Sequence, residues 1–102
     1  MLQLRPICEN CEKSLPPDST EAMICSYECT FCRDCYEKIL KNVCPNCGGG
    51  LVSRPIRPRK NWKDNNYLGA DPPITERKYQ PIDLDSFQPL RDRILEISPE
   101  KR

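Results

Sequence analysis

All eight cysteines of this 102-residue chain fall between positions 8 and 47, in four close pairs. The pairs are Cys8 with Cys11, Cys25 with Cys29, Cys32 with Cys35, and Cys44 with Cys47. A Cys-x2-Cys turn aims two thiolates at one ion, and Zn²⁺ accepts four such ligands tetrahedrally at about 2.3 Å. The spacing therefore predicts two structural zinc ions, each bound by four cysteines.

Other uses of the same cysteines stay open. An even cysteine count in a short chain also permits a disulfide framework. Residues 1–15 lack an apolar stretch of signal-peptide length, which favours a cytoplasmic protein and reduced thiols. Iron–sulfur ligation and redox-active thiols are further alternatives, although no βαβ pattern of a thioredoxin-like unit is seen. Sensing of zinc or of thiol oxidation also fits these residues, because oxidation of one ligand would unfold its site.

The number of cysteines argues against catalysis. Catalytic zinc sites usually keep three protein ligands and one open position, whereas eight cysteines divide evenly into two closed sets of four. We therefore expect no catalytic residues and a protein that is not an enzyme.

The composition agrees with a domain that is held together by metal instead of a large core. Apolar residues make up only 37% of the chain, and the cysteines are counted among them. Small domains with little apolar surface usually need a metal or a disulfide, and zinc can contribute about 10–16 kcal/mol of apparent folding free energy. No apolar run approaches the length of a membrane span, so no membrane association is expected.

Charge is distributed unevenly along the chain. Residues 1–53 carry five basic and seven acidic side chains, a balance of −2, whereas residues 54–102 carry eleven basic and eight acidic ones, a balance of +3. Each four-thiolate zinc site is formally −2, so two loaded sites would bring the first half to about −6. Such a surface disfavours nucleic acid, whose phosphates attract positive charge.

Short elements must position the cysteines. Residues 21–26 are the best strand candidate, and residues 27–31 are expected to return as the second strand of a hairpin. Residues 2–4 are expected to form a short strand or a packed arm, and residues 51–52 are expected to add a closing strand. Residues 33–42 are predicted to form one helix of two to three turns.

The predicted helix has one apolar face, because Tyr36, Ile39 and Leu40 recur at helical spacing. Cys32 and Cys35 lie at its N-terminus, where thiolates are electrostatically favoured. The expected small core consists of Met23, Ile24, Phe31, Tyr36, Ile39 and Leu40.

The second half of the chain has a different character. Prolines separate the arginines of residues 54–59 and predict an extended basic linker instead of a packed segment. Farther on, four apolar residues at helical spacing predict a helix near residues 86–97, which should dock somewhere if it is ordered. We therefore divide the chain into a two-zinc domain, residues 1–54, and a largely irregular extension, residues 55–102.

Two ways of sharing the cysteines between the ions compete. In the sequential arrangement, the first four cysteines bind one ion and the last four bind the other. In the interleaved arrangement, the first and third pairs bind one ion, and the second and fourth pairs bind the other. A helix over residues 35–42 spans about 12 Å at about 1.5 Å per residue, so Cys35 and Cys44 at its two ends can hardly share an ion. The geometry favours interleaving.

The order of the eight cysteines resembles the RING-type cross-brace over residues 8–47. The resemblance includes an aromatic residue, Phe31, directly before the fifth cysteine, a helix after the sixth, and Cys44-Pro45-x-Cys47 at the end. It implies a small metal-stabilised α+β fold with a short hairpin and one helix.

Four further motifs are similar to a bacterial family known as domain of unknown function 1272. They are Leu4-Arg5-Pro6, Leu15-Pro16-Pro17-Asp18-Ser19, Glu28-Cys29-Thr30-Phe31-Cys32 and Val43-Cys44-Pro45-Asn46-Cys47-Gly48-Gly49. The family is short, cysteine-rich and RING-like, and has no assigned activity. The similarity covers roughly residues 1–58, and nothing is carried over to the extension.

The chain departs from RING ubiquitin ligases in three respects. It contains no histidine, the residue before the second cysteine is the polar Asn10, and the residue after the last cysteine is Gly48. Many such ligases have an apolar residue at the position of Asn10 and a basic residue at the position of Gly48. Both of these residues contact the conjugating enzyme. The resemblance thus implies that both contacts are missing here.

These observations predict a non-enzymatic zinc protein that serves as a protein-interaction module for an unidentified partner. Its groove would lie between the two metal loops and the helix, near Asn10, Pro45 and Asn46. A ubiquitin-ligase-like scaffold is the alternative from the enzyme class, weakened by Asn10 and Gly48. The sequence does not specify an oligomeric state.

Nucleic-acid binding through the linker is a further alternative, in which Trp62 would stack on a base. The basic residues concerned are Arg54, Arg57, Arg59, Lys60 and Lys63. A solvated linker is the simpler interpretation of such a charged, proline-rich run.

Overall fold

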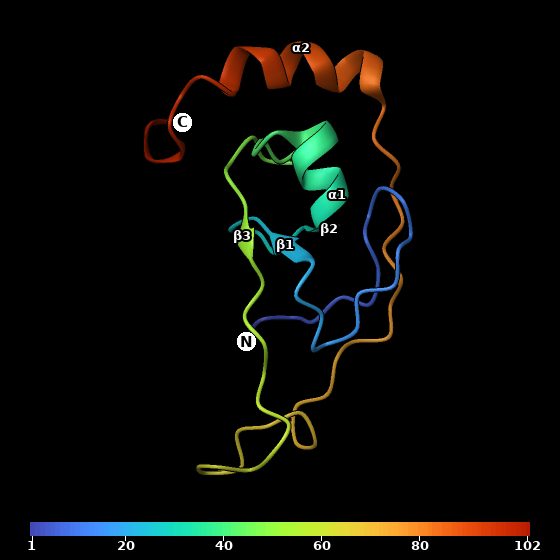
Figure 1. Ribbon diagram of the computed structural model, residues 1–102, viewed down its shortest axis with the longest axis vertical. Helices are drawn as coiled ribbons and strands as arrows, with labels where there is room; N and C mark the ends of the chain where they lie inside the picture. The colour runs from blue at the N-terminus through green and yellow to red at the C-terminus, as the bar shows by residue number, and fades with distance from the viewer.

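Three short antiparallel strands form the sheet of the computed structural model, which describes residues 1–102. Strand β1 (Ala22–Ile24) lies between β2 (Thr30–Cys32) and β3 (Val52–Ser53) (Figure 1). Met23 lies opposite Phe31 of β2 on one side and opposite Ser53 of β3 on the other. The sequence thus predicted the hairpin, and it placed the closing strand one residue too early.

Residues 2–4 form a packed arm, the second of the two structures expected for them, and not a strand. These residues have no strand partner, although the Leu4 carbonyl accepts a hydrogen bond from the Ile74 backbone N–H at 3.2 Å. Leu4 is 1% exposed, so this arm is held by burial of a side chain instead of a ladder of backbone hydrogen bonds.

The predicted first helix is present but is wound in two ways. It starts as α1 (Arg33–Cys35) and continues as a π-helical segment, η1 (Tyr36–Leu40). Lys41 ends it in the left-handed conformation with φ 49°, and the Lys41 N–H donates to the Tyr36 carbonyl at 2.9 Å. The helix is therefore two residues shorter than the predicted range of 33–42, and wider winding of this kind is common at functional sites.

The core combines cysteines with a few aliphatic and aromatic side chains. Phe31 is 1% exposed and Leu40 is fully buried, whereas Tyr36 and Ile39 pack against the same cluster while partly exposed. Phe87, from the far end of the sequence, belongs to this cluster as well. The extension therefore packs on the core of the cysteine-rich half.

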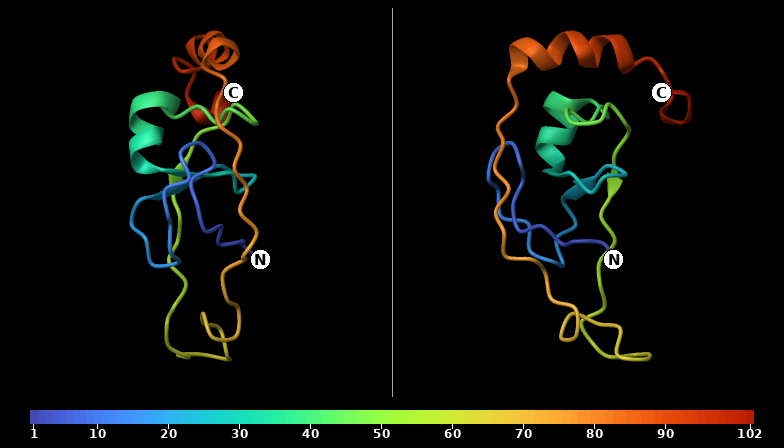
Figure 2. Two further views of the ribbon diagram at one scale, coloured as in Figure 1. Left: turned by 90° about the vertical axis from the view of Figure 1, so that its right-hand side faces the viewer. Right: turned by 180° about the vertical axis from the view of Figure 1, so that it is seen from behind.

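The second helix, α2 (Leu84–Ile94), lies across the end of the molecule that carries α1 (Figures 1 and 2). It begins two residues earlier and ends three residues earlier than the predicted range of 86–97. The Asp83 side chain caps it by accepting a hydrogen bond from the Asp85 N–H at 3.1 Å. A single 3₁₀ turn, η2 (Pro99–Lys101), ends the chain.

The basic run that was expected to be an extended linker is partly packed. Arg54 is 4% exposed and donates to the carbonyls of Arg5, Leu15 and Pro16 at 2.9–3.3 Å. Arg57 donates to the carbonyls of Leu2 and Asp71, both at 2.7 Å.

Between these anchors and the return of the chain, a loop projects from the end of the molecule opposite α2 (Figure 1, yellow). A backbone hydrogen bond of 2.9 Å from Leu68 to Pro58 closes its neck. Residues 55–83 as a whole contain no helix or strand. No helix of the structure has the length and apolar character needed to cross a membrane.

Candidate metal centre

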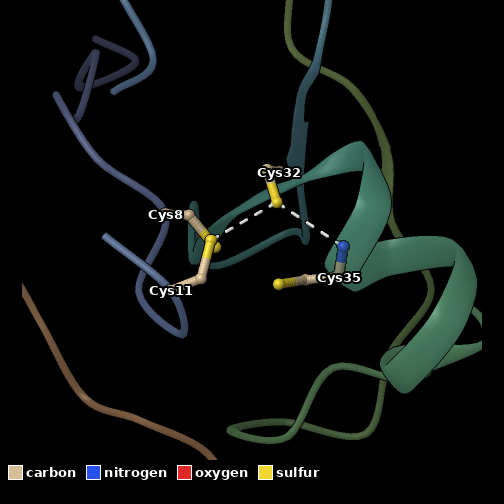
Figure 3. Close-up of side chains that lie close together, drawn as sticks. All are labelled: Cys8, Cys11, Cys32 and Cys35. Atoms are coloured by element: carbon tan, nitrogen blue, oxygen red, sulfur yellow. Dashed lines mark hydrogen bonds between the residues drawn. The ribbon is translucent and has the colours of Figure 1, made fainter. Parts of the chain in front are cut away.

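Four sulfur atoms converge where the first cysteine loop meets the start of α1. The Sγ atoms of Cys8, Cys11, Cys32 and Cys35 all lie within 4.8 Å of one another, and Figure 3 shows them turned toward a common point. Cys11 Sγ is 3.7 Å from Cys32 Sγ. The first loop contributes one pair, and β2 with α1 contributes the other.

A second group forms where the turn after β1 meets the last cysteine loop. The Sγ atoms of Cys25, Cys44 and Cys47 lie within 4.8 Å of one another. Cys29, the fourth ligand expected here, is outside this three-sulfur group but is buried next to it, at 7% exposed. The structure thus brings seven of the eight predicted ligands into two groups.

The grouping follows the interleaved arrangement and not the sequential one. The first and third cysteine pairs form the four-sulfur group, and members of the second and fourth pairs form the other. Cys35 and Cys44 belong to different groups because α1 and η1 lie between them.

Backbone amides face several of the sulfurs. The N–H groups of Tyr27, Asn46 and Gly49 donate to the sulfurs of Cys25, Cys44 and Cys47 at 3.3–3.4 Å. In the first group, the Cys35 N–H donates to Cys32 Sγ at 3.5 Å. Such bonds favour sulfur atoms that carry negative charge.

Burial has the opposite effect on the free thiols. It raises the pKa of Cys35 and of Cys44, and negative neighbouring cysteines raise both further. Burial likewise raises the pKa of Cys29 and Cys32. At Cys11, which is exposed, hydrogen bonds from the Lys13 backbone and from neighbouring cysteines outweigh burial and lower the pKa. A dication at each group would replace these protons, since thiolates are the form that binds metal.

The donor sets fit a metal ion. All eight cysteines are free thiols, and soft thiolates select ions such as zinc over magnesium or calcium. One residue of each group is exposed, Cys11 in the first and Cys47 in the second, whereas the other members are buried.

One buried acidic residue beside the sulfurs was not predicted. Glu9 is 1% exposed, and its carboxylate accepts hydrogen bonds from the Thr30 N–H at 3.0 Å and from Asn46 Nδ2 at 3.2 Å. Lys78 Nζ lies 3.8 Å from the same carboxylate. A glutamate between two cysteines in a short loop has no periodicity that distinguishes it from a solvated charge, so no sequence signal could have found it.

Two of the three residues expected to border a groove, Pro45 and Asn46, line a cavity, whereas Asn10 does not. This cavity has a volume of about 250 Å³, with Pro45 and Asn46 on one wall. The other wall belongs to the extension, and the full lining is Glu9, Phe31, Pro45, Asn46, Gln80, Pro81, Ile82, Asp83, Ser86, Phe87 and Leu90.

Asn10 itself faces both the metal centre and the extension. Its Nδ2 donates to Cys35 Sγ at 3.3 Å, and its Oδ1 accepts from the Ile82 N–H at 2.9 Å. The polar side chain of Asn10 thus connects the four-sulfur group to the extension by two hydrogen bonds.

The backbone conformation and the close packing at Gly48 both favour glycine at this position. It has φ +77°, and a Cβ added there would lie 3.2 Å from Ile94 Cδ1.

The structure separates the basic residues that the nucleic-acid hypothesis grouped together. Arg54 and Arg57 are occupied by backbone carbonyls, as described above. Arg59, Lys60 and Lys63 remain exposed on the projecting loop. Trp62 is 77% exposed there, with Lys60 Nζ 5.9 Å from its ring centroid. The surface available for phosphates is therefore smaller than the sequence suggested.

Comparison with known proteins finds relatives without an assigned activity. The model of the family described as Protein of unknown function (DUF1272) matches residues 1–57, which include all eight cysteines. An uncharacterized protein of Rhizobium meliloti (strain 1021) is 64% identical over 63 residues, which cover 62% of this chain and 75% of the relative. No solved structure matches the chain.

Proposed function

The chain belongs to the DUF1272 family, and from that premise we propose that it is a non-enzymatic zinc protein. In this proposal two all-cysteine sites hold a RING-like cross-brace, which serves as a protein-interaction module. The observation that carries the proposal is the interleaved convergence of cysteine sulfurs from four separate pairs into two groups.

Zinc is the ion that this donor chemistry supports best. Structural zinc sites are closed, tetrahedral and often built from four cysteines. The first group offers four sulfurs already gathered. In the second group we assign Cys29 as the fourth ligand, because its thiol is buried and the Cys25 and Asn46 side chains are its neighbours.

The RING-like cross-brace follows from how the sites share the chain. The helical segment from Arg33 to Leu40 runs from one group to the other, so each site fixes one of its ends. Phe31, shortly before this segment, is almost fully buried, and Leu40, its last residue, is fully buried. Metal at both sites would therefore hold a core that is too small to be stable by itself.

The closed cysteine sites and the groove support a role in protein interaction and not in catalysis. Sites filled by four protein sulfurs keep no position for a substrate or an activated water. The groove between the cysteine loops offers apolar walls at Phe31 and Pro45 next to the polar Asn46, which is the surface composition of a peptide-binding site. We place the protein in the cytoplasm, because thiols stay reduced there and all eight cysteines are free.

Native mass spectrometry of the chain purified under reducing conditions tests the zinc sites. We expect a single species whose mass exceeds that of the metal-free chain by two zinc ions less the four protons that their charge replaces. A chain that holds disulfides, an iron–sulfur cluster or no metal would contradict the proposal.

Site-specific photo-crosslinking tests the interaction role. A crosslinking residue at Asn46, in the groove, should capture a protein partner in the host bacterium. The same residue at Thr20, which is exposed and does not line the cavity, should not capture that partner. Equal capture from both positions would show that the groove is not the site at which the partner binds.

A further inference from the structure

The part of the extension from Lys78 to Leu95, here called the docking segment, lies on the groove between the two cysteine loops. Its first part is extended and pairs through its backbone. The Gln80 N–H donates to the Glu9 carbonyl at 2.8 Å, and the Ile82 N–H donates to Asn10 Oδ1 at 2.9 Å. Backbone pairing of an extended stretch is a common mode of peptide recognition.

Its second part is α2, which presents an apolar face to the same groove. Phe87 is 4% exposed and belongs to the core cluster. Leu90 and Ile94 follow at spacings of three and four residues and pack against that cluster while partly exposed. Phe87 and Leu90 line the cavity together with Phe31. This is the pattern of a helix laid into a groove.

Charge on the extension complements the end of the first helix. Arg91 donates to the Ile39 carbonyl at 3.0 Å, and Arg102 donates to the Asn42 carbonyl at 2.6 Å. The Ile39 carbonyl lies in the last turn of the segment from Arg33 to Leu40, and the Asn42 carbonyl lies two residues beyond its end. A helix collects partial negative charge at that end and leaves its last carbonyls without internal partners.

The fit of the docking segment is incomplete. The cavity of about 250 Å³ remains between Phe87 and the groove wall, and Phe87 is the one fully buried side chain of α2. The segment also lies outside residues 1–57, the part that matches the family. Since an isolated helix of this length is marginal in water, the segment gains order only by docking.

We propose that the groove is a peptide-binding site and that the docking segment is its intramolecular, displaceable occupant. A partner takes the groove with the same chemistry: an extended stretch that donates two backbone N–H groups, followed by a helix with apolar residues at spacings of three and four. This inference rests on the interaction role proposed above and names both the ligand class and the regulation of that site.

The test uses the full chain and a synthetic peptide with the sequence of residues 78–95. In an opened variant, Phe87→Ser with Leu90→Ser, the groove loses its own occupant. We expect the peptide to bind this variant with an apparent Kd at least about tenfold lower than that of the unmodified chain, because the docked segment competes in the latter. Amide NMR signals of Glu9, Asn10 and Asn46 should shift on binding.

Two controls match the variant. The exposed substitutions Leu84→Ser and Gln88→Ser change the same helix on its outer side, so this chain should behave as the unmodified one. A peptide that carries Phe87→Ser should not bind. Equal affinity of the native peptide for the opened and unmodified chains, or no binding to the opened variant, would overturn the proposal.

Hydrogen exchange gives a second readout on the unmodified chain. Excess peptide should raise the exchange rates of the α2 amides at least about tenfold, because it holds the segment off the groove. Unchanged rates in the presence of the peptide would also overturn the proposal. Failure of the zinc proposal would appear separately, as a native mass without metal.

Discussion

Glu9 accepts a hydrogen bond from the Asn46 side-chain amide at 3.2 Å and so joins the first cysteine loop to the last. Its second carboxylate oxygen accepts from the Thr30 N–H at 3.0 Å, between Cys29 and Cys32. One buried side chain therefore ties together loops that carry ligands of both sulfur groups.

Replacement of Glu9 by alanine should destabilise the fold. The buried Thr30 N–H would lose its acceptor, at a cost of about 1–3 kcal/mol for an unsatisfied group, whereas Asn46 is exposed and its amide would bind water instead. We expect a loss of about 1–3 kcal/mol in the free energy of unfolding, measured by urea denaturation with zinc present. Glu37→Ala is the matched control, because Glu37 is exposed, and it should change stability by less than about 0.5 kcal/mol. An equal effect of the two substitutions would refute the linking role of Glu9.

Cys29→Ser should lower the zinc content from two ions per chain to one. Cys44→Ser, which removes a member of the observed three-sulfur group, should have the same effect. Zinc is counted by native mass spectrometry, and Ser26→Ala serves as the control for a change in the same turn. If Cys29→Ser keeps both ions at full affinity, the second site has only three cysteine ligands and Cys29 is structural.

Zinc affinity should fall as the pH is lowered. Burial holds the pKa of Cys35 and Cys44 above the ordinary value for a thiol, so both are protonated in the metal-free fold at neutral pH. Metal must displace these protons, and the affinity gains a factor of about ten per pH unit for each proton released. Chelator competition between about pH 6 and 8 measures the affinity, and an affinity independent of pH would show that the thiols are ionised before metal binds.

Arg54→Met should destabilise the protein strongly although it removes no ion pair. The guanidinium serves the carbonyls of Arg5, Leu15 and Pro16, and burial lowers its pKa. Methionine keeps most of the volume but leaves these carbonyls without a donor, so we expect a loss of about 2–4 kcal/mol. Arg59→Met changes a side chain that is 80% exposed and should have almost no effect. Urea denaturation of both variants, with zinc present, separates the two outcomes.

The cysteine pattern by itself predicted much of the candidate site. Spacing of two or three residues within each pair determines which sulfurs can meet locally, and the helix between Cys35 and Cys44 keeps these two apart. The interleaved grouping was therefore predictable from chain length and helix rise. The hairpin and both helices were predictable from apolar spacing, with ends displaced by one to three residues.

Only the tertiary structure decided what surrounds the sulfurs. The burial of Glu9 and Arg54 depends on amides and carbonyls brought from loops up to 49 residues away, and no local pattern encodes such partners. The same holds for the docking segment, whose apolar spacing predicted a helix but not its place. Metal ligands are recognisable in sequence because their geometry is local, whereas a groove exists only after distant segments have packed against each other.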